Sequence, residues 1–215
     1  MLNILNQQNS IANQFIAELR NVDVQADRMR FRRNLERIGE VMAYEISRTM
    51  EYVETEITTP LGVANAFLIK EQPILATILR AGLPLHNGLL NYFDQADNAF
   101  ISAYRRHHKD GSFDINLEYV SSPSLENRIL ILCDPMLATG QSLVLTYKAL
   151  MQYGKPKHTH VVAGISSKDG IAHIQANLND VTIWTGAVDE ELTSKAYIVP
   201  GLGDAGDLAY GAKDS

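Results

Sequence analysis

The sequence predicts an α/β fold in which a mostly parallel sheet is flanked by helices. Residues 73–79 and 129–133 are continuous apolar runs, which are typical of strands buried on both faces of a parallel sheet. Each run is followed by a turn of small residues and then by a stretch with helical periodicity. The alternation of strand and helix continues to residue 188, which indicates right-handed βαβ crossovers within one sheet.

Length and composition favour one domain over residues 1–215, with a helical segment at 1–50 and a separate tail at 190–215. The net charge of −6 argues against binding to nucleic acid or to an acidic membrane. A single cysteine, Cys133, excludes an internal disulfide and fits a reducing cytosol. Because no signal peptide and no membrane-spanning run is recognisable, we expect a cytoplasmic protein.

The first 50 residues are expected to form helices. One apolar stripe consists of Ile11, Phe15, Ile16 and Leu19. A longer stripe begins after Asp27 and consists of Phe31, Leu35, Ile38, Met42 and Ile46. The second helix also carries five cations, Arg28, Arg30, Arg32, Arg33 and Arg37. We interpret them as a solvated face or a dimer rim rather than as a nucleic-acid site.

Two segments before the main sheet predict a hairpin. Val53–Thr59 alternates and is rich in β-branched residues, Pro60–Gly62 is a turn, and Val63–Ile69 follows. We expect this hairpin to lie outside the main sheet.

The first buried strand, Pro73–Leu79, is followed by Arg80, Ala81 and Gly82 and then by a helix to about Phe93. Small residues directly after a strand allow the backbone to approach a ligand. Arg80 would therefore stand at the carboxyl edge of the sheet, where open α/β sheets bind ligands. The alternative is a salt-bridged surface arginine.

A basic loop is expected between two further strands, Ala99–Tyr104 and Asp114–Val120. Residues 105–113 would form its tip, which contains Arg105, Arg106, His107 and His108. The tip is either a solvated turn or a lid whose cations meet an anionic group, a task that suits the planar fork of arginine.

Residues 128–147 combine a strand, a turn and a helix. The strand Ile129–Cys133 ends at Asp134, and Pro135 is expected to stop the ladder. Thr139 and Gly140 form the turn, and a helix follows through Leu143, Val144, Tyr147 and Leu150.

This combination predicts an anion site. The backbone N–H groups of Ala138–Ser142 can converge on a phosphate at the positive end of the helix dipole. Thr139 and Ser142 add hydroxyl donors, and Asp134 lies where sugar hydroxyls or a metal would be presented. The alternative is an ordinary βα connection with Ser142 as the N-cap.

The later chain continues the same alternation. We expect a strand at His158–Ile165, a helix at Asp169–Leu178 and a strand at Val181–Val188.

The tail contains a glycine-rich segment from Tyr197 to Asp207. Gly201, Gly203 and Gly206 satisfy G-x-G-x-x-G, but a dinucleotide site would need a following helix in a βαβ unit and an acid about 20 residues on. Only nine residues remain after Gly206. The segment can instead expose backbone N–H and C=O groups that match the edge of a pyrimidine.

Two stretches resemble one known family. Residues 134–142, Asp-Pro-Met-Leu-Ala-Thr-Gly-Gln-Ser, resemble the PRPP-binding loop of type I phosphoribosyltransferases in its uracil phosphoribosyltransferase form, with Gln141 where that family has glycine. Residues 197–207, Tyr-Ile-Val-Pro-Gly-Leu-Gly-Asp-Ala-Gly-Asp, resemble the family's uracil-binding C-terminus. The chain continues with Leu208-Ala-Tyr210, where the family usually has a basic residue and then phenylalanine. The resemblance extends from about residue 40 to the end.

The resemblance implies roles for individual residues. Arg80, Arg105 and Asp204 would be catalytic and would also bind PRPP. The rest of the PRPP site would be Asp134, Pro135, Met136, Leu137, Ala138, Thr139, Gly140, Gln141 and Ser142. Uracil would contact Ile198, Gly203, Asp204 and Ala205. Mg²⁺ would be held through PRPP with no firm protein ligand.

The activity that the resemblance implies is the transfer of the phosphoribosyl group of PRPP to uracil, giving UMP and pyrophosphate. The family also suggests a homodimer or higher homo-oligomer, with GTP as a candidate allosteric activator. Three alternatives stay open: a phosphoribosyltransferase for another base, the related pyrimidine-operon regulator that binds RNA, and a non-catalytic relative that senses PRPP or nucleotide.

Overall fold

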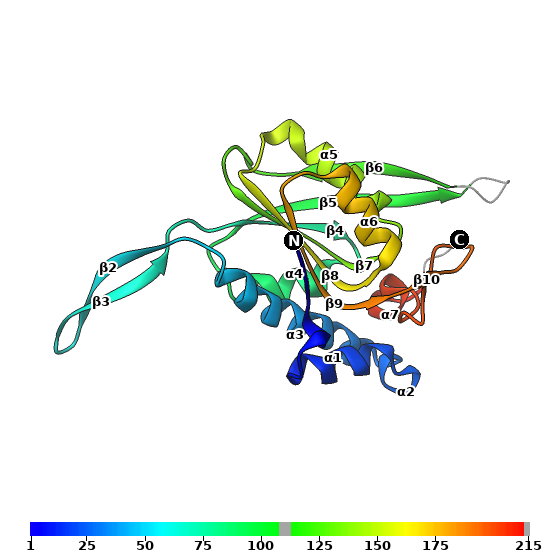
Figure 1. The fold of residues 1–215 in the computed structure, drawn as a ribbon, viewed down its shortest axis with the longest axis horizontal. Coiled ribbons are helices and arrows are strands. Elements are labelled where there is room, and N and C mark those ends of the chain that lie inside the picture. Colours follow the sequence, from blue (N-terminus) through cyan, green and yellow to red (C-terminus); the bar gives the residue numbers. More distant parts are fainter. Residues whose placement is uncertain (108–112, 213–215) are drawn as a thin grey trace.

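A seven-stranded sheet forms the centre of the molecule (Figure 1). This computed structural model describes residues 1–107 and 113–212, without the side chains of 103–107 and 113–117. The strands of the sheet are β1 (Leu2–Ile4), β4 (Ile74–Leu79), β5 (Asp97–His107), β6 (Phe113–Ser121), β7 (Ile129–Leu137), β8 (His158–Ser167) and β9 (Val181–Asp189). Their order across the sheet is β1-β9-β8-β7-β4-β5-β6, and every neighbouring pair is parallel except β5 and β6. The predicted fold class is confirmed.

Helices cover both faces of this sheet (Figure 1). They are α1 (Ile11–Arg20), α2 (Val22–Gln25), α3 (Arg28–Ser47), α4 (Leu83–Leu90), α5 (Gln141–Leu150), α6 (Lys168–Asn177) and α7 (Ala205–Tyr210), with 3₁₀ turns η1 (Leu5–Gln7) and η2 (Met151–Tyr153). The helices α1, α3 and α4 pack on one face, and α5 and α6 pack on the other. Successive residues of the buried strands point to opposite faces of the sheet, so each face has its own hydrophobic core. Ile131 lies in the core beneath α3, and Leu130 lies in the core beneath α5.

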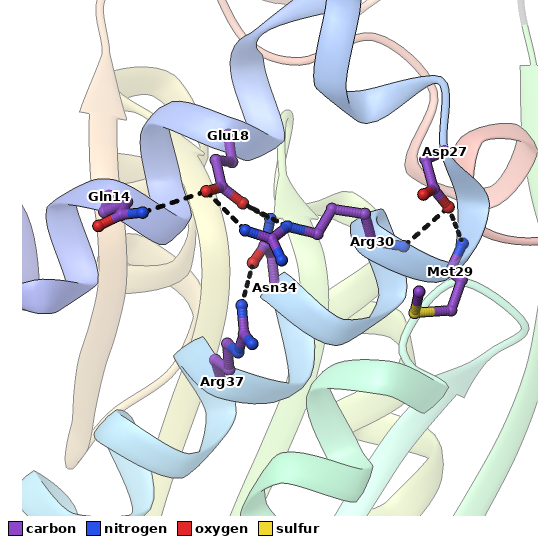
Figure 2. A network of polar contacts seen from close by, with 7 residues as sticks. All are labelled: Gln14, Glu18, Asp27, Met29, Arg30, Asn34 and Arg37. Carbon is purple, nitrogen blue, oxygen red and sulfur yellow. Dashed lines mark hydrogen bonds and ion pairs between the residues drawn. The ribbon is translucent and has the colours of Figure 1, made fainter.

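The long helix α3 confirms the predicted stripe, because all five of its apolar positions are buried. Asp27 caps this helix: its carboxylate accepts hydrogen bonds from the backbone N–H groups of Met29 and Arg30 (Figure 2). In α1, Ile16 and Leu19 are buried, whereas Ile11 is exposed. The two helices therefore begin and pack largely as their sequence pattern dictates.

The cations of α3 do more than form a solvated face. Arg30 makes an ion pair with Glu18 of α1 at 2.7 Å, and Asn34 donates to the same carboxylate (Figure 2). Arg32 donates to the carbonyl of Ala209 in α7 at 2.7 Å. These side chains join α3 to α1 and to the tail, which a one-dimensional pattern of charges does not reveal.

The strands β2 (Tyr52–Thr59) and β3 (Gly62–Ile69) form a separate two-stranded antiparallel sheet. Figure 1 shows this hairpin projecting away from the body of the molecule, as predicted. It exposes a set of large apolar side chains: Tyr52, Val53, Ile57, Leu61, Val63, Phe67 and Leu68.

The structure differs from the local expectations at four points. Pro135 does not end the ladder, since β7 pairs with β8 up to Leu137. Its pairing with β4 ends at Cys133, so Pro135 lies where one side of the strand has no ladder to interrupt. The helix after Arg80 ends at Leu90 rather than near Phe93.

The other two differences concern helix starts. Gly140, not Ser142, is the N-cap of α5, and it adopts a left-handed conformation with φ 77°. Helix α7 was not expected at all. Within the described part of the chain, no helix is long and apolar enough to cross a membrane.

Candidate active site

The phosphate loop, residues 134–142, joins β7 to α5. Asp134–Leu137 are the last residues of β7, and the turn at Ala138–Gly140 leads into the first turn of the helix. The unpaired N–H groups of a helix N-terminus and its dipole favour an anion here. The structure therefore brings the predicted strand, turn and helix start together in the expected order.

The loop is held from one side by α6. The Ser167 hydroxyl donates to the carbonyl of Ala138 and also accepts from the N–H of Gly170 at 2.8 Å. A Cβ on Gly170 would lie 2.7 Å from the carbonyl oxygen of Leu137, so no side chain fits between α6 and the loop. A Cβ on Gly140 would lie 3.0 Å from the carbonyl oxygen of Gly170. The backbone path of the loop is thus determined by main-chain packing.

Arg80 lies at the same edge of the sheet as Asp134. Strands β4 and β7 are parallel and paired at Thr77 and Cys133, so both end on the carboxyl side. Gly82 is tightly enclosed, because a Cβ there would lie 2.7 Å from the carbonyl oxygen of Ile78. The close contacts of Gly82 are with the protein itself, so the approach of this backbone to a ligand stays a prediction.

The guanidinium of Arg80 contacts the tail, defined here as residues 190–212. Its Nη2 donates to the carbonyl of Gly211 at 2.5 Å and to Oδ1 of Asp207 at 3.3 Å. Its Nε is buried and has no hydrogen-bond partner within the described residues. The tail thus accepts hydrogen bonds from Nη2 of Arg80, while the Nε–H donor has no acceptor among the described residues.

The tail consists of a small sheet, a glycine-rich turn and a helix. Strand β11 (Ile198–Val199) pairs with β10 (Glu191–Leu192), and Gly201 and Gly203 follow with positive φ of 54° and 96°. Such φ values favour glycine. Ile198 and Ala205 are buried, whereas Gly203 and Asp204 are exposed.

Asp204 begins α7. Its Oδ1 accepts hydrogen bonds from the N–H groups of Gly206 at 2.8 Å and Asp207 at 3.0 Å. The segment Gly203–Ala205 therefore forms the junction between the glycine turn and the helix. A cavity of about 470 Å³ opens beside it, between α2 and the tail, and is lined by Gln25, Gly203, Asp204, Asp207 and Leu208 among others.

The N-terminal helix α1 holds the other end of the tail. Arg20 makes a bidentate ion pair with Asp189, at 2.7 and 2.9 Å, and also donates to the carbonyl of Gly201 at 3.1 Å. Asp189 is 8% exposed, and it accepts from the N–H of Gly201 at 3.0 Å. We call Arg20, Asp189 and Gly201 the tail clasp.

Sequence reasoning did not identify Arg20, Asp189 or Asp207 as site residues. Arg20 and Asp189 are 169 positions apart, and neither lies in a motif. Asp207 lies within the recognised segment, but its partner Arg80 is 127 positions away. Contacts at such separations leave no local signal.

The basic loop is only partly described. Arg105, Arg106 and His107 lie at the end of β5, but their side chains are outside the description, and His108 lies outside the described residues. The predicted roles of these four residues stay predictions.

Cys133 is not a nucleophile. Complete burial raises the pKa of its thiol to about 12, so the thiolate is not formed near neutral pH. Cys133 instead packs as a small, fully buried residue of β7. In the part of the chain that the structure describes, no group of three or more His, Cys, Asp and Glu side chains could hold a metal ion.

Comparisons with known proteins extend over nearly the whole chain. Residues 6–212 match the family model described as uracil phosphoribosyltransferase. The chain is 52% identical over 210 residues to a uracil phosphoribosyltransferase of Porphyromonas gingivalis, with 97% of each chain covered. It is 37% identical over 202 residues to a protein of the same name from Thermococcus gammatolerans, covering 93% of this chain and 88% of that one. Among solved structures, the AQ2163 protein of Aquifex aeolicus superposes with a TM-score of 0.87 at 28% identity, covering 98% of each chain.

Proposed function

The chain belongs to the uracil phosphoribosyltransferase family, and from this premise we propose that it transfers the phosphoribosyl group of PRPP to uracil, giving UMP and pyrophosphate. The observation that carries this proposal is that Arg80 and the phosphate loop follow paired strands at one edge of the sheet, and that Arg80 donates to the tail at Asp207 and Gly211. The enzyme is then a pentosyltransferase of pyrimidine salvage.

The phosphate loop would bind the 5′-phosphate of PRPP. The N–H groups of Ala138–Ser142 and the hydroxyls of Thr139 and Ser142 supply donors, and the helix dipole of α5 favours the negative charge. Gln141 is exposed at the first position of α5. Asp134 would accept from the ribose hydroxyls.

Arg80 and Arg105 would stabilise the departing pyrophosphate. The unpartnered Nε of Arg80 supports its part in this proposal, because a buried donor without a partner is satisfied when an anion binds. The transition state of such a transfer carries oxocarbenium character on the sugar and growing charge on the leaving group. Positioned donors, rather than a protein nucleophile, therefore provide most of the catalysis.

The residues present fit a magnesium ion that is carried by the substrate. Mg²⁺ prefers oxygen ligands and keeps several waters, and the described residues offer carboxylates at Asp134 and Asp204 but no protein cage. When bound with PRPP, the ion would neutralise charge on the pyrophosphate. The protein's own contribution would be to orient PRPP through the phosphate loop and Arg80.

Uracil would lie against the tail. Backbone groups of Ile198, Gly203 and Ala205 can present donors and acceptors that match O2, N3–H and O4 of the base. Asp204 would contact PRPP and the base, while its Oδ1 already accepts the N–H groups of α7.

A panel of bases tests the proposal directly. Purified protein with Mg²⁺ and PRPP is incubated with labelled uracil, cytosine, hypoxanthine, guanine or adenine, and the nucleotide product is quantified. UMP formed from uracil alone is the expected result. A product from another base would point to a different phosphoribosyltransferase, and PRPP binding without turnover would point to a non-catalytic sensor. Neither outcome agrees with the proposal.

We also propose a homodimer or higher homo-oligomer, because the projecting hairpin exposes apolar side chains that a second copy would cover. Phe67, which is 68% exposed, is a suitable probe. Phe67→Glu should shift the mass measured by light scattering toward the monomer, whereas Tyr119→Glu, at an exposed aromatic outside the hairpin, should not. A monomeric wild type would refute this assembly.

Location and regulation are further expectations of the family. We propose one domain over residues 1–215, which the family match over residues 6–212 supports. We also propose a cytoplasmic protein that acts without nucleic acid or membrane, which the net charge of −6 supports. GTP as an allosteric activator is tested by initial rates at subsaturating PRPP with and without GTP.

A further inference from the structure

Arg80, which binds PRPP in the proposed function, makes a contact with Asp207 of the tail, and no role in the reaction has been assigned above to Asp207. Their ion pair measures 3.3 Å, with the side chains 33% and 44% exposed. Because the carboxylate reaches only the Nη2 end of the guanidinium, the Nε donor stays without a partner among the described residues. Asp207 therefore restrains Arg80 without consuming all its donors.

A second acceptor strengthens this restraint. The carbonyl of Gly211 accepts from the same Nη2 at 2.5 Å, and the N–H of Gly211 donates to the carbonyl of Asp207 at 2.8 Å. Asp207 thus contacts Arg80 through its side chain and positions Gly211 through its main chain. The two acceptors of Arg80 thus lie on α7 (Asp207) and directly after it (Gly211).

Helix α7 continues the connection to the proposed uracil site. The N–H of Asp207 donates to Oδ1 of Asp204 at 3.0 Å, and the N–H of Leu208 donates to the carbonyl of Asp204 at 3.0 Å. One short helical turn therefore carries Asp204, which faces the substrates in the proposed function, and Asp207, which holds Arg80. A charge-assisted hydrogen bond to a carboxylate fixes the orientation of a planar guanidinium better than a neutral contact does.

We propose that Asp207 is a positioning residue, which orients the Arg80 guanidinium for the pyrophosphate of PRPP and couples the PRPP site to the uracil-binding tail through α7. This inference rests on the proposed function and assigns to the second aspartate of the tail segment a role distinct from that of Asp204. When Arg80 binds an anion, its side chain loses rotational freedom, which costs conformational entropy. The ion pair with Asp207 already restricts this rotation in the free protein, so less entropy is lost on binding.

Steady-state kinetics of Asp207→Asn test the proposal. The asparagine keeps the size of the side chain and the backbone bonds of α7 but removes the charge. We expect KM for PRPP to rise about 5- to 10-fold and kcat to change less than about threefold, as suits one partly exposed charge-assisted contact. Asp207→Glu, which restores the carboxylate, should bring KM for PRPP back to within about threefold of wild type.

A matched control exists at the opposite edge of the sheet. Asp97 pairs with Arg128 at 3.2 Å and is 55% exposed, so Asp97→Asn removes the same charge from an arginine–aspartate contact of similar length and exposure. Its KM for PRPP should equal that of wild type. A purely structural role of Asp207 would lower the melting temperature and leave KM for PRPP unchanged.

A double-mutant cycle locates the effect. If Asp207 acts through Arg80, Asp207→Asn should cost little further PRPP affinity in an Arg80→Lys background. Additive effects, or a lower KM for PRPP in Asp207→Asn, would overturn the proposal, since the latter would mean that Asp207 competes with the substrate. Wild-type enzyme that makes no UMP would instead refute the proposed function, so the two failures are distinguishable.

Discussion

The phosphate loop and the tail are built by different means, although both present backbone to a ligand. The loop continues β7, whose ladder with β8 extends to Leu137, and α6 packs against it at Gly170. The tail has a sheet of only two strands with two residues each, and side chains from distant elements hold it. Arg20, Arg32 and Arg80 all donate to tail carbonyl groups.

This difference suggests how each region tolerates change. Where main-chain packing determines the path, added volume is the damaging change, because the backbone has no room to move. Where arginines hold a segment, loss of a single charge loosens it, and a buried partner is left uncompensated. Substitutions of the two kinds should therefore separate PRPP binding from uracil binding.

The largest effect is expected at Arg80, which lies at the same edge of the sheet as the phosphate loop and donates to the tail. Arg80→Ala would remove the proposed pyrophosphate contact and releases Gly211 and Asp207, so kcat/KM for PRPP should fall about 100-fold or more. Initial-rate assays measure the loss. Arg128→Ala, at an arginine of the opposite edge, serves as the control for removing a paired guanidinium. An unchanged rate in Arg80→Ala would remove this residue from the catalytic site.

Gly170→Ala should damage the loop but spare the tail. The new methyl group would meet the carbonyl oxygens of Leu137 and Ala138, so the phosphate loop must shift. We expect PRPP affinity to fall about 10-fold or more, because displaced donors no longer match the phosphate. Isothermal titration calorimetry measures the affinity, with Gln175→Ala as an exposed control on the same helix. Unaltered PRPP binding would show that α6 does not determine the loop.

Arg20→Ala should weaken uracil binding and leave PRPP binding nearly unchanged. It opens the tail clasp and leaves the carboxylate of Asp189, 8% exposed, without its ion pair, at a cost of about 2 kcal/mol in the free energy of unfolding. KM for uracil should rise about 5-fold, with little change in KM for PRPP, because the loosened glycine turn presents the base contacts less often. A larger change for PRPP than for uracil would contradict the distinction between the two regions.

The smallest effect concerns the helix pair that carries the clasp. Hydrogen bonds from Arg30 and Asn34 lower the pKa of Glu18 to about 2 (Figure 2). Since the folded-state pKa lies below the ordinary value of 4.5, the stabilisation is present above about pH 4.5 and is lost as pH falls toward 2. Solvent screening reduces it to about 1 kcal/mol.

Urea unfolding at pH 6 and pH 3 measures this contribution. Wild type should lose about 0.6 kcal/mol more stability than Glu18→Gln over this interval, because the glutamine does not titrate and pH 3 lies between the two pKa values of Glu18. Equal losses in both proteins would show that the ion pair with Arg30 contributes nothing measurable.

The sequence by itself determined the elements that depend on local periodicity. The strands Pro73–Leu79 and Ile129–Cys133, the stripe of α3 and the hairpin turn at Pro60–Gly62 are all present near their predicted positions. Apolar spacing and glycine or proline positions act over a few residues, and tertiary contacts reinforced rather than changed them. The phosphate loop and the glycine-rich segment were identified for the same reason.

Tertiary structure alone decided the rest. Pro135 stays within β7 because only one side of that strand is paired there, and Arg32 and Arg80 hold the C-terminal end of α7. The partners of Arg20 and Arg80 lie 169 and 127 positions away. A chain reveals such contacts only once it has folded, because the energy of a charge pair depends on distance in space and not on separation in sequence.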